Sequence, residues 1–166
     1  NTNINLPVTQ CEDNDFYLDH LYDGTVNSAG SLFLDVQAGS LENSRRWVIY
    51  GHYMRNGTMF ADLLNYKEQS YYDEHPVFLL VTPEARYRVE LFSGYVAGVD
   101  ADAWRLEFTG EEDFSAWLAG CKAASAFQSD VEPWPDDQII TLSTCSYEFS
   151  NARFVLHGVL QKVEET

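Results

Sequence analysis

Basic residues, cysteines and long apolar runs are all scarce in this sequence. Lys and Arg total 10 against 26 Asp and Glu, so the formal net charge is −16 at pH 7. This charge repels a phosphate backbone and an anionic membrane surface, so nucleic acid is not an expected partner. A bilayer-spanning helix needs about 18 or more apolar residues in succession, and no such run occurs. Neutral or cationic partners, such as peptides and amines, are favoured, although an acidic surface also serves solubility alone.

The three cysteines, Cys11, Cys121 and Cys145, form no disulfide or zinc pattern. Their odd number leaves at least one thiol free, and neither C-x-x-C nor a paired His/Cys spacing occurs. The acidic clusters at 12–15, 111–113 and 136–137 lack EF-hand spacing and are predicted to be solvated turns and a helix start. We therefore expect neither a metal ion nor a cofactor.

Length and composition predict one domain, residues 1–166, because 166 residues with 45% hydrophobic content are too few for two ample cores. Short runs rich in β-branched and aromatic residues dominate the pattern. They lie at 31–36, 46–51, 77–82, 86–92, 103–108, 138–144 and 153–160. This succession of strands predicts a mainly β fold, a closed or nearly closed β-barrel with a few helices.

Two helices are predicted between these strands. The first follows Thr58 as its N-cap, and the second begins at a capping box formed by Thr109 and Glu112. Apolar residues of the second helix recur at helical spacing, at Phe114, Trp117, Leu118 and Cys121. Cys121 is predicted to be an inert core thiol, since a free cysteine packs as a small hydrophobe.

Cys145 stands at the end of an apolar strand, where polar residues resume. A nucleophilic thiol needs access, a means of becoming thiolate and stabilisation of the oxyanion that it generates. The end of a strand provides the access. Taken alone, a cysteine at such a place is more often a packing thiol.

His52 and Arg153 supply the other two requirements. His52 closes the run WVIYGH before a glycine-containing turn, which predicts a base at the barrel rim. Arg153 opens the last strand, so the loop SYEFSNA can return its guanidinium to the thiol, where a cation favours thiolate and binds an oxyanion. The alternative is a surface arginine paired with one of the many acids. Surface or packing roles are expected for His20, His75 and His157.

The residues TLSTC at 141–145, followed by Arg153, and VIYGHYMRNGTMFADL at 48–63 resemble the sortase family of cysteine transpeptidases, specifically its class B. Further similarity lies in NINLPVTQ and DNDFYL near the start and in AGSLFLD at 29–35. A helix at 110–127, ahead of the cysteine-bearing strand, is an insertion typical of class B. The resemblance covers essentially the whole chain and implies a sortase-type closed β-barrel.

The resemblance implies that Cys145 is the nucleophile, His52 the general acid/base and Arg153 the residue that binds the oxyanion or orients substrate. Ser143 and Thr144 lie where class B enzymes contact substrate. Sortases cleave a C-terminal sorting motif of a secreted protein after its threonine, hold the acyl group as a thioester and transfer it to an amine of a cell-wall precursor or a pilin. Class B enzymes also carry N-terminal helices and a membrane anchor, which implies an extracytoplasmic enzyme that faces the cell wall and whose anchor is missing here.

Two other functions are compatible with the residues. One is a non-catalytic peptide-binding β-barrel in which Cys145 is a packing thiol, and the other is a thiol hydrolase with water as the acceptor. Asp62 and Glu148 are candidates, by sequence neighbourhood, for a carboxylate that orients His52. The sequence leaves open the sorting motif, the acceptor amine and the choice between wall anchoring and pilus polymerisation.

Overall fold

The computed structural model describes residues 2–40 and 43–164. The strands, in chain order, are β1 (Val8–Thr9), β2 (Leu32–Leu34), β3 (Arg46–Tyr50), β4 (Val77–Val81), β5 (Arg86–Gly98), β6 (Gln138–Cys145) and β7 (Ala152–Val163). The α-helices are α1 (Gln69–Glu74) and α2 (Glu111–Ala124), and the 3₁₀ helices are η1 (Phe16–Leu18), η2 (Ala61–Lys67) and η3 (Asp102–Trp104).

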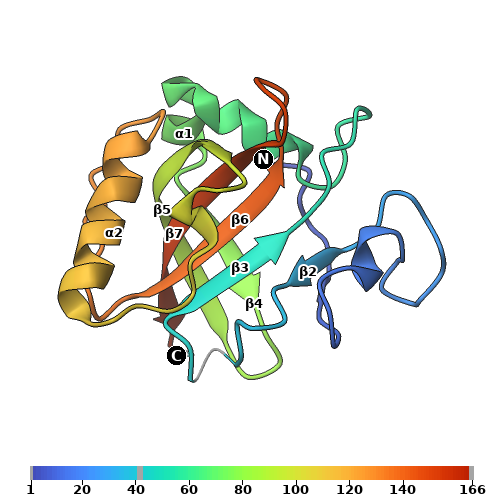
Figure 1. Cartoon of the computed structure of the whole chain (residues 1–166), viewed down its shortest axis with the longest axis horizontal. Helices are drawn as coiled ribbons and strands as arrows, with labels where there is room; N and C mark the ends of the chain where they lie inside the picture. Colours follow the sequence, from blue (N-terminus) through green and yellow to red (C-terminus); the bar gives the residue numbers. More distant parts are fainter. Residues whose placement is uncertain (1, 41–42, 165–166) are drawn as a thin grey trace.

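The strands form one curled sheet in the order β1-β2-β3-β6-β7-β5-β4 (Figure 1). β3 pairs with β6 in parallel, and β6 pairs with β7 antiparallel, so the cysteine-bearing strand is flanked on both sides. The mainly β prediction is confirmed, as is a helix, α2, ahead of β6. In the described residues the edge strands β1 and β4 do not pair with each other, so the barrel is open along that seam.

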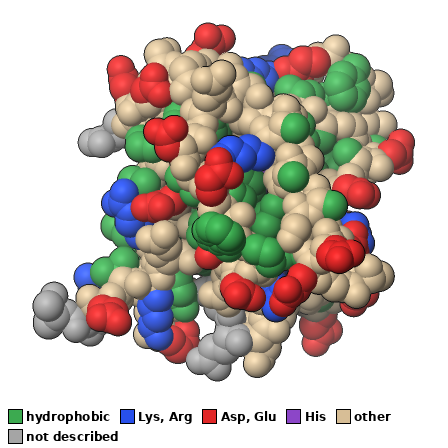
Figure 2. Space-filling model, turned by 90° about the vertical axis from the view of Figure 1, so that its left-hand side faces the viewer, with side chains coloured by type: hydrophobic (Ala, Val, Ile, Leu, Met, Phe, Trp, Pro, Cys, Tyr) green, Lys and Arg blue, Asp and Glu red, His purple; other side chains and the backbone are tan. Residues whose placement is uncertain are grey.

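Successive residues of β6 belong to two different cores. Ile140 and Leu142 pack inside the curled sheet with residues of β2, β3, β5 and β7. Ile139, on the other face, packs under α2, whose predicted stripe of Phe114, Trp117, Leu118 and Cys121 is buried. This division follows from the alternation of side chains along a strand. Figure 1 shows α2 beside β5 and β7, and Figure 2 shows that side of the molecule, where acidic side chains are widely scattered.

Six of the seven predicted strand ranges contain strands, and the range 103–108 does not. There the chain forms η3 and then a loop. Ala103 and Trp104 pack against Ala97 and Val155, and Arg105 pairs with Asp113. The β-like alternation of this segment therefore serves packing onto the outside of β5 and β7 rather than a strand ladder.

The helix starts also differ from the predictions. After Thr58 the chain forms η2 and then α1, and the Thr58 hydroxyl bonds to Asn56 instead of capping a helix. At α2 the N-cap position is Gly110, and Thr109 bonds to the Asp113 carboxylate rather than forming a box with Glu112. Asp113 lies one residue further along and accepts from both the main chain and the hydroxyl of Thr109.

Candidate functional site

The parallel pairing of β3 with β6 brings His52 and Cys145 to one edge of the sheet. The register aligns Tyr50 with Ser143, and the Gly51 N–H donates to the Ser143 carbonyl at 3.1 Å. His52 and Cys145 each follow the Tyr50–Ser143 pair by two residues. Because parallel strands end at the same edge, both side chains belong to one rim.

Cys145 and Arg153 are directly opposed in the antiparallel pairing of β6 with β7. Directly opposed residues of such a pair project from the same face, with Cβ atoms about 5 Å apart. The loop between them closes with a hydrogen bond from the Ser146 N–H to the Ala152 carbonyl at 2.9 Å. Asn151, just before β7, has a φ of 62°, a conformation that asparagine tolerates better than most residues. The loop thus returns Arg153 to the end of the strand that carries the thiol.

All three rim side chains are partly accessible. Cys145, His52 and Arg153 are each half-buried, in contrast to Cys121, which is 3% exposed. Arg153 donates to the Ala152 carbonyl at 3.0 Å, and none of the ion pairs among the described residues includes it. The expected alternative, a surface arginine paired with an acid, is therefore not what this part of the chain shows.

A main-chain carbonyl orients His52. Its Nε2 lies 2.6 Å from the carbonyl oxygen of Leu18, the last residue of η1. Because a carbonyl only accepts, Nε2 carries the proton of this bond, which leaves Nδ1 as the second nitrogen. Sequence reasoning missed Leu18 because a carbonyl contact carries no side-chain signature.

Neither predicted carboxylate orients His52. Asp62 accepts a hydrogen bond from the Asn3 N–H at 2.9 Å, and Glu148 binds Lys67 and Ser146. Nearness in sequence therefore did not identify a partner of His52, because both carboxylates bind other residues.

Ser143 and Thr144 are both buried, on opposite faces of β6. The Ser143 hydroxyl accepts from the Trp104 indole N–H at 2.9 Å. Thr144 Oγ1 has no hydrogen-bond partner in residues 2–40 and 43–164. Trp104, also missed from the sequence, thus connects η3 to the strand that ends at the thiol.

A second group of cysteine, histidine and arginine lies beneath α2. Arg46 donates to Thr141 Oγ1 at 2.7 Å, and the same oxygen lies 2.8 Å from His157 Nδ1. His157 Nε2 is 3.4 Å from the Tyr95 hydroxyl, which is 3.6 Å from the Cys121 sulfur. These contacts form one continuous buried polar chain. It was not predicted because its members are far apart in sequence.

Burial determines the ionisation of that group. Desolvation lowers the pKa of Arg46 to about 9 and the pKa of His157 well below 6.5. It also raises the pKa of the Cys121 thiol to about 11. Removal from water disfavours the charged form of every group, so Cys121 remains a thiol at neutral pH. The inert core role predicted for Cys121 agrees with this environment.

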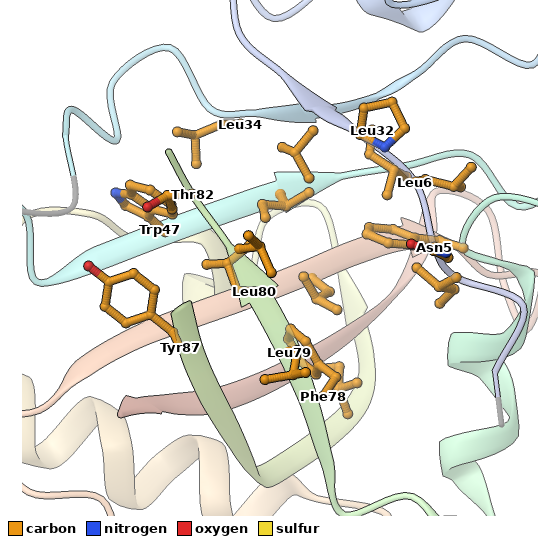
Figure 3. Close-up of a pocket in the computed structure, with 18 of the residues that line it drawn as sticks. Asn5, Leu6, Leu32, Leu34, Trp47, Phe78, Leu79, Leu80, Thr82 and Tyr87 are labelled. Carbon is orange, nitrogen blue, oxygen red and sulfur yellow. The ribbon is translucent and has the colours of Figure 1, made fainter. Parts of the chain in front are cut away.

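A cavity of about 1150 Å³ lies at the open seam of the sheet, and none of the three rim residues lines it. Figure 3 shows Leu34, Trp47, Leu80 and Tyr87 gathered around it from different strands. Its lining contains no cysteine and is largely aliphatic and aromatic. The cavity therefore offers no thiol to act as the nucleophile of a cysteine enzyme.

Neither a metal-binding cluster nor a membrane-spanning helix is present in the described ranges. Within residues 2–40 and 43–164, no group of three or more His, Cys, Asp or Glu side chains is arranged to hold a metal ion. None of the helices built from these residues has the length and apolarity of a membrane span.

Comparison with known proteins gives a consistent set of relatives, although no protein-family model matches the chain. The chain is 37% identical over 161 residues to sortase B of Listeria monocytogenes. The aligned residues make up 96% of this chain and 65% of that protein. The chain therefore spans a little less than two thirds of the length of this curated relative.

Solved structures of the same kind superimpose closely. A Staphylococcus aureus sortase B–substrate complex has a TM-score of 0.93 and 31% identity, covering 98% of this chain and 76% of that chain. A sortase B complexed with triglycine has a TM-score of 0.92 and 31% identity, covering 98% of this chain and 77% of that chain. These matches extend over nearly the whole of this chain. The chain belongs to the sortase B family.

Proposed function

We propose that the chain is a cysteine transpeptidase in which Cys145 is the nucleophile, His52 the general acid/base and Arg153 the oxyanion-binding residue. One observation carries the proposal. The pairing of β6 with its two neighbours sets Arg153 opposite Cys145 and ends β3 just before His52, on one accessible rim. The family resemblance supports the assignment of these roles.

Acyl transfer on this rim proceeds in two steps. The Cys145 thiolate attacks the threonine carbonyl of the peptide, a C–S bond forms, and the oxyanion accepts hydrogen bonds from Arg153. The C–N bond then breaks as protonated His52 gives a proton to the leaving amine, and a thioester remains. An incoming amine attacks the thioester, gives its proton to His52 and displaces the thiolate. Since Nε2 bonds to Leu18, Nδ1 is the nitrogen that we assign to these transfers.

The substrates that we propose are a C-terminal sorting motif, cleaved after threonine, and an amine of a cell-wall precursor or a pilin. Relatives solved with a substrate and with triglycine support a peptide donor and an amine acceptor. The net charge of −16 favours a cationic amine near the surface. Ser143 and Thr144 remain candidate substrate contacts on the family resemblance alone, since both side chains are buried and both residues lie within the ladder of β6.

The location that we propose follows from the family. Sortases are enzymes of the cell surface, and we place this catalytic domain, residues 1–166, on the outer face of the membrane with its full-length protein anchored there. No cofactor enters the proposed reaction.

The experiment that tests this function is intact-protein mass spectrometry after incubation with a panel of sorting-motif peptides. We expect a peptide-sized adduct that is absent in Cys145→Ala and that disappears when an amine is added. A folded protein that forms no adduct and cleaves no peptide supports the non-catalytic binding barrel. Cleavage with no gain in product on adding amine supports a thiol hydrolase.

A further inference from the structure

Lys67, the last residue of η2, contacts the loop that joins Cys145 to Arg153. Its ammonium donates to Ser146 Oγ at 3.3 Å and forms an ion pair with Glu148. The Ser146 hydroxyl donates in turn to the other carboxylate oxygen of Glu148. Three side chains from two segments thus make a closed ring of polar contacts.

This ring lies next to the proposed nucleophile. Ser146 directly follows Cys145, is 5% exposed, and its N–H donates to the Ala152 carbonyl beside Arg153. Its main chain and side chain are therefore both fixed, one by the start of β7 and the other by the Lys67–Glu148 pair. A shift of this ring would move the end of β6, and with it Cys145.

The segment that ends at Lys67 begins at His52. The His52 carbonyl accepts from the Phe60 N–H at 3.0 Å, and η2 starts at the next residue, Ala61. The same segment also meets the loop through Tyr53, whose ring is 5.3 Å from that of Tyr147. Residues 52–67 thus contact the 146–151 loop in two places, and Lys67 supplies the ionic contact.

An ordinary surface ion pair is the competing explanation. The side chains of Lys67 and Glu148 are 31% and 39% exposed, and pairs at such sites contribute little to folding stability. The Lys122–Glu132 pair is a matched example, because it joins α2 to the segment before β6 rather than to the loop after it. The two pairs differ in position, and the Glu132 side chain is also more exposed, at 72%.

We propose that Lys67 is a positioning residue for acyl transfer, holding the 146–151 loop through Glu148 and Ser146 so that Cys145 stays aligned with Arg153 and His52. The inference rests on the proposed function for its catalytic consequence. The effect of Lys67 on the position of Cys145 can be measured without a substrate.

The test compares Lys67→Met, Lys67→Arg, Glu148→Gln and the control Lys122→Met. We expect Lys67→Met and Glu148→Gln to lower kcat for peptide transfer about tenfold with little change in KM, because small misalignments at a reacting centre are costly. Lys67→Arg should recover most of the rate, and Lys122→Met should match the wild type. All four variants are expected to keep a thermal midpoint close to that of the wild type.

A second readout separates this inference from the proposed function. The rate of Cys145 alkylation by iodoacetamide should change about threefold or more in Lys67→Met and return in Lys67→Arg, whatever the substrate is. A wild type that transfers no peptide contradicts the proposed function and leaves this readout intact. Equal alkylation rates in wild type and Lys67→Met, or equal losses in Lys67→Met and Lys122→Met, would overturn the positioning role. If Lys67→Met fails to fold, Glu148→Gln provides the same comparison with the wild type.

Discussion

Two regions of this molecule contain the same three side-chain types and differ in what surrounds them. At the rim, Cys145, His52 and Arg153 are partly exposed. Beneath α2 the corresponding residues, Cys121, His157 and Arg46, are no more than 3% exposed. The rim set lies at the end of β6, whereas the buried set joins Arg46 and His157, on either side of Thr141, to Cys121 of α2 through Tyr95.

We infer from this difference that position decides what a cysteine, a histidine and an arginine can do together. Burial holds Cys121 and His157 in their neutral forms, so the inner set can neither attack nor exchange protons at neutral pH. Its hydrogen bonds instead fasten α2 and η3 to the sheet. The rim set has access, and its members are aligned by strand register rather than by direct bonds to one another. Activity should therefore depend on the rim residues, and stability on the buried ones.

The largest contrast is expected between the two cysteines. Cys145→Ala should abolish thioester formation, because no other group at the rim replaces the sulfur. Cys121→Ala should leave the transfer rate within about twofold and reduce the free energy of unfolding by about 1–2 kcal/mol, the usual cost of a small buried truncation. Peptide transfer assays and urea unfolding measure the two effects. Loss of transfer in Cys121→Ala, with the fold intact, would break the contrast.

The next-largest contrast is expected in kcat, between variants of His52 and variants of His157. His52→Ala should lower kcat by about 10²–10⁴-fold, the range for loss of a general acid/base. In the wild type two groups must hold the correct protonation states together, so the rate should follow a bell-shaped curve against pH. His157→Gln should leave the shape of that curve unchanged. A wild-type rate that is flat from mildly acidic to alkaline pH would contradict the two-group assignment.

Substitution of the two arginines should change kcat less than substitution of the histidines does. It should separate the two sites clearly in the free energy of unfolding. Arg153→Ala should lower kcat by about 10²–10³-fold, the cost of one oxyanion donor, with little change in unfolding. Arg46→Met should instead reduce the free energy of unfolding with little change in kcat. The substitution leaves Thr141 and the carbonyls of Ala103 and Arg105 without their hydrogen-bond donor. We expect a loss of about 3 kcal/mol in chemical denaturation. Similar unfolding curves for Arg46→Met and wild type would refute the structural role of this buried chain.

The smallest expected effect is the change in the free energy of unfolding that His157 causes below pH 6.5. The depressed pKa of His157 means that the unfolded chain binds a proton below pH 6.5 that the folded chain does not. Stability from this group is complete above pH 6.5 and falls as pH drops, by at most about 1.4 kcal/mol per pH unit. The difference in unfolding free energy between wild type and His157→Gln should therefore narrow from pH 7 to pH 5. A constant difference would show that folding does not lower the pKa of His157.

Short-range patterns in the sequence predicted most of the fold. The apolar stripe of α2 and the strand at Cys145 follow from periodicity, and both are present. The strand predicted at 103–108 was wrong. Trp104 and its neighbours alternate like a strand but pack onto an existing sheet. The helix starts were wrong because Asp113 and Asn56 competed for the predicted caps.

The candidate site was predictable only in part. Cys145, His52 and Arg153 carry chemistry that is visible in single residues, and family resemblance joined them. The Leu18 carbonyl, the Trp104 indole and the Lys67 ammonium act through contacts between distant segments. No spacing rule encodes such contacts, because tertiary structure alone brings their partners together.

The most direct test of the central claim is to locate the acyl group. The protein would be incubated with an intact sorting peptide that it is found to cleave, quenched in acid, digested and sequenced by tandem mass spectrometry. We predict a thioester on Cys145, with Cys121 unmodified in the folded protein. An acyl group on Cys121 or Cys11, or peptide transfer with Cys145 unmodified throughout, would contradict the account.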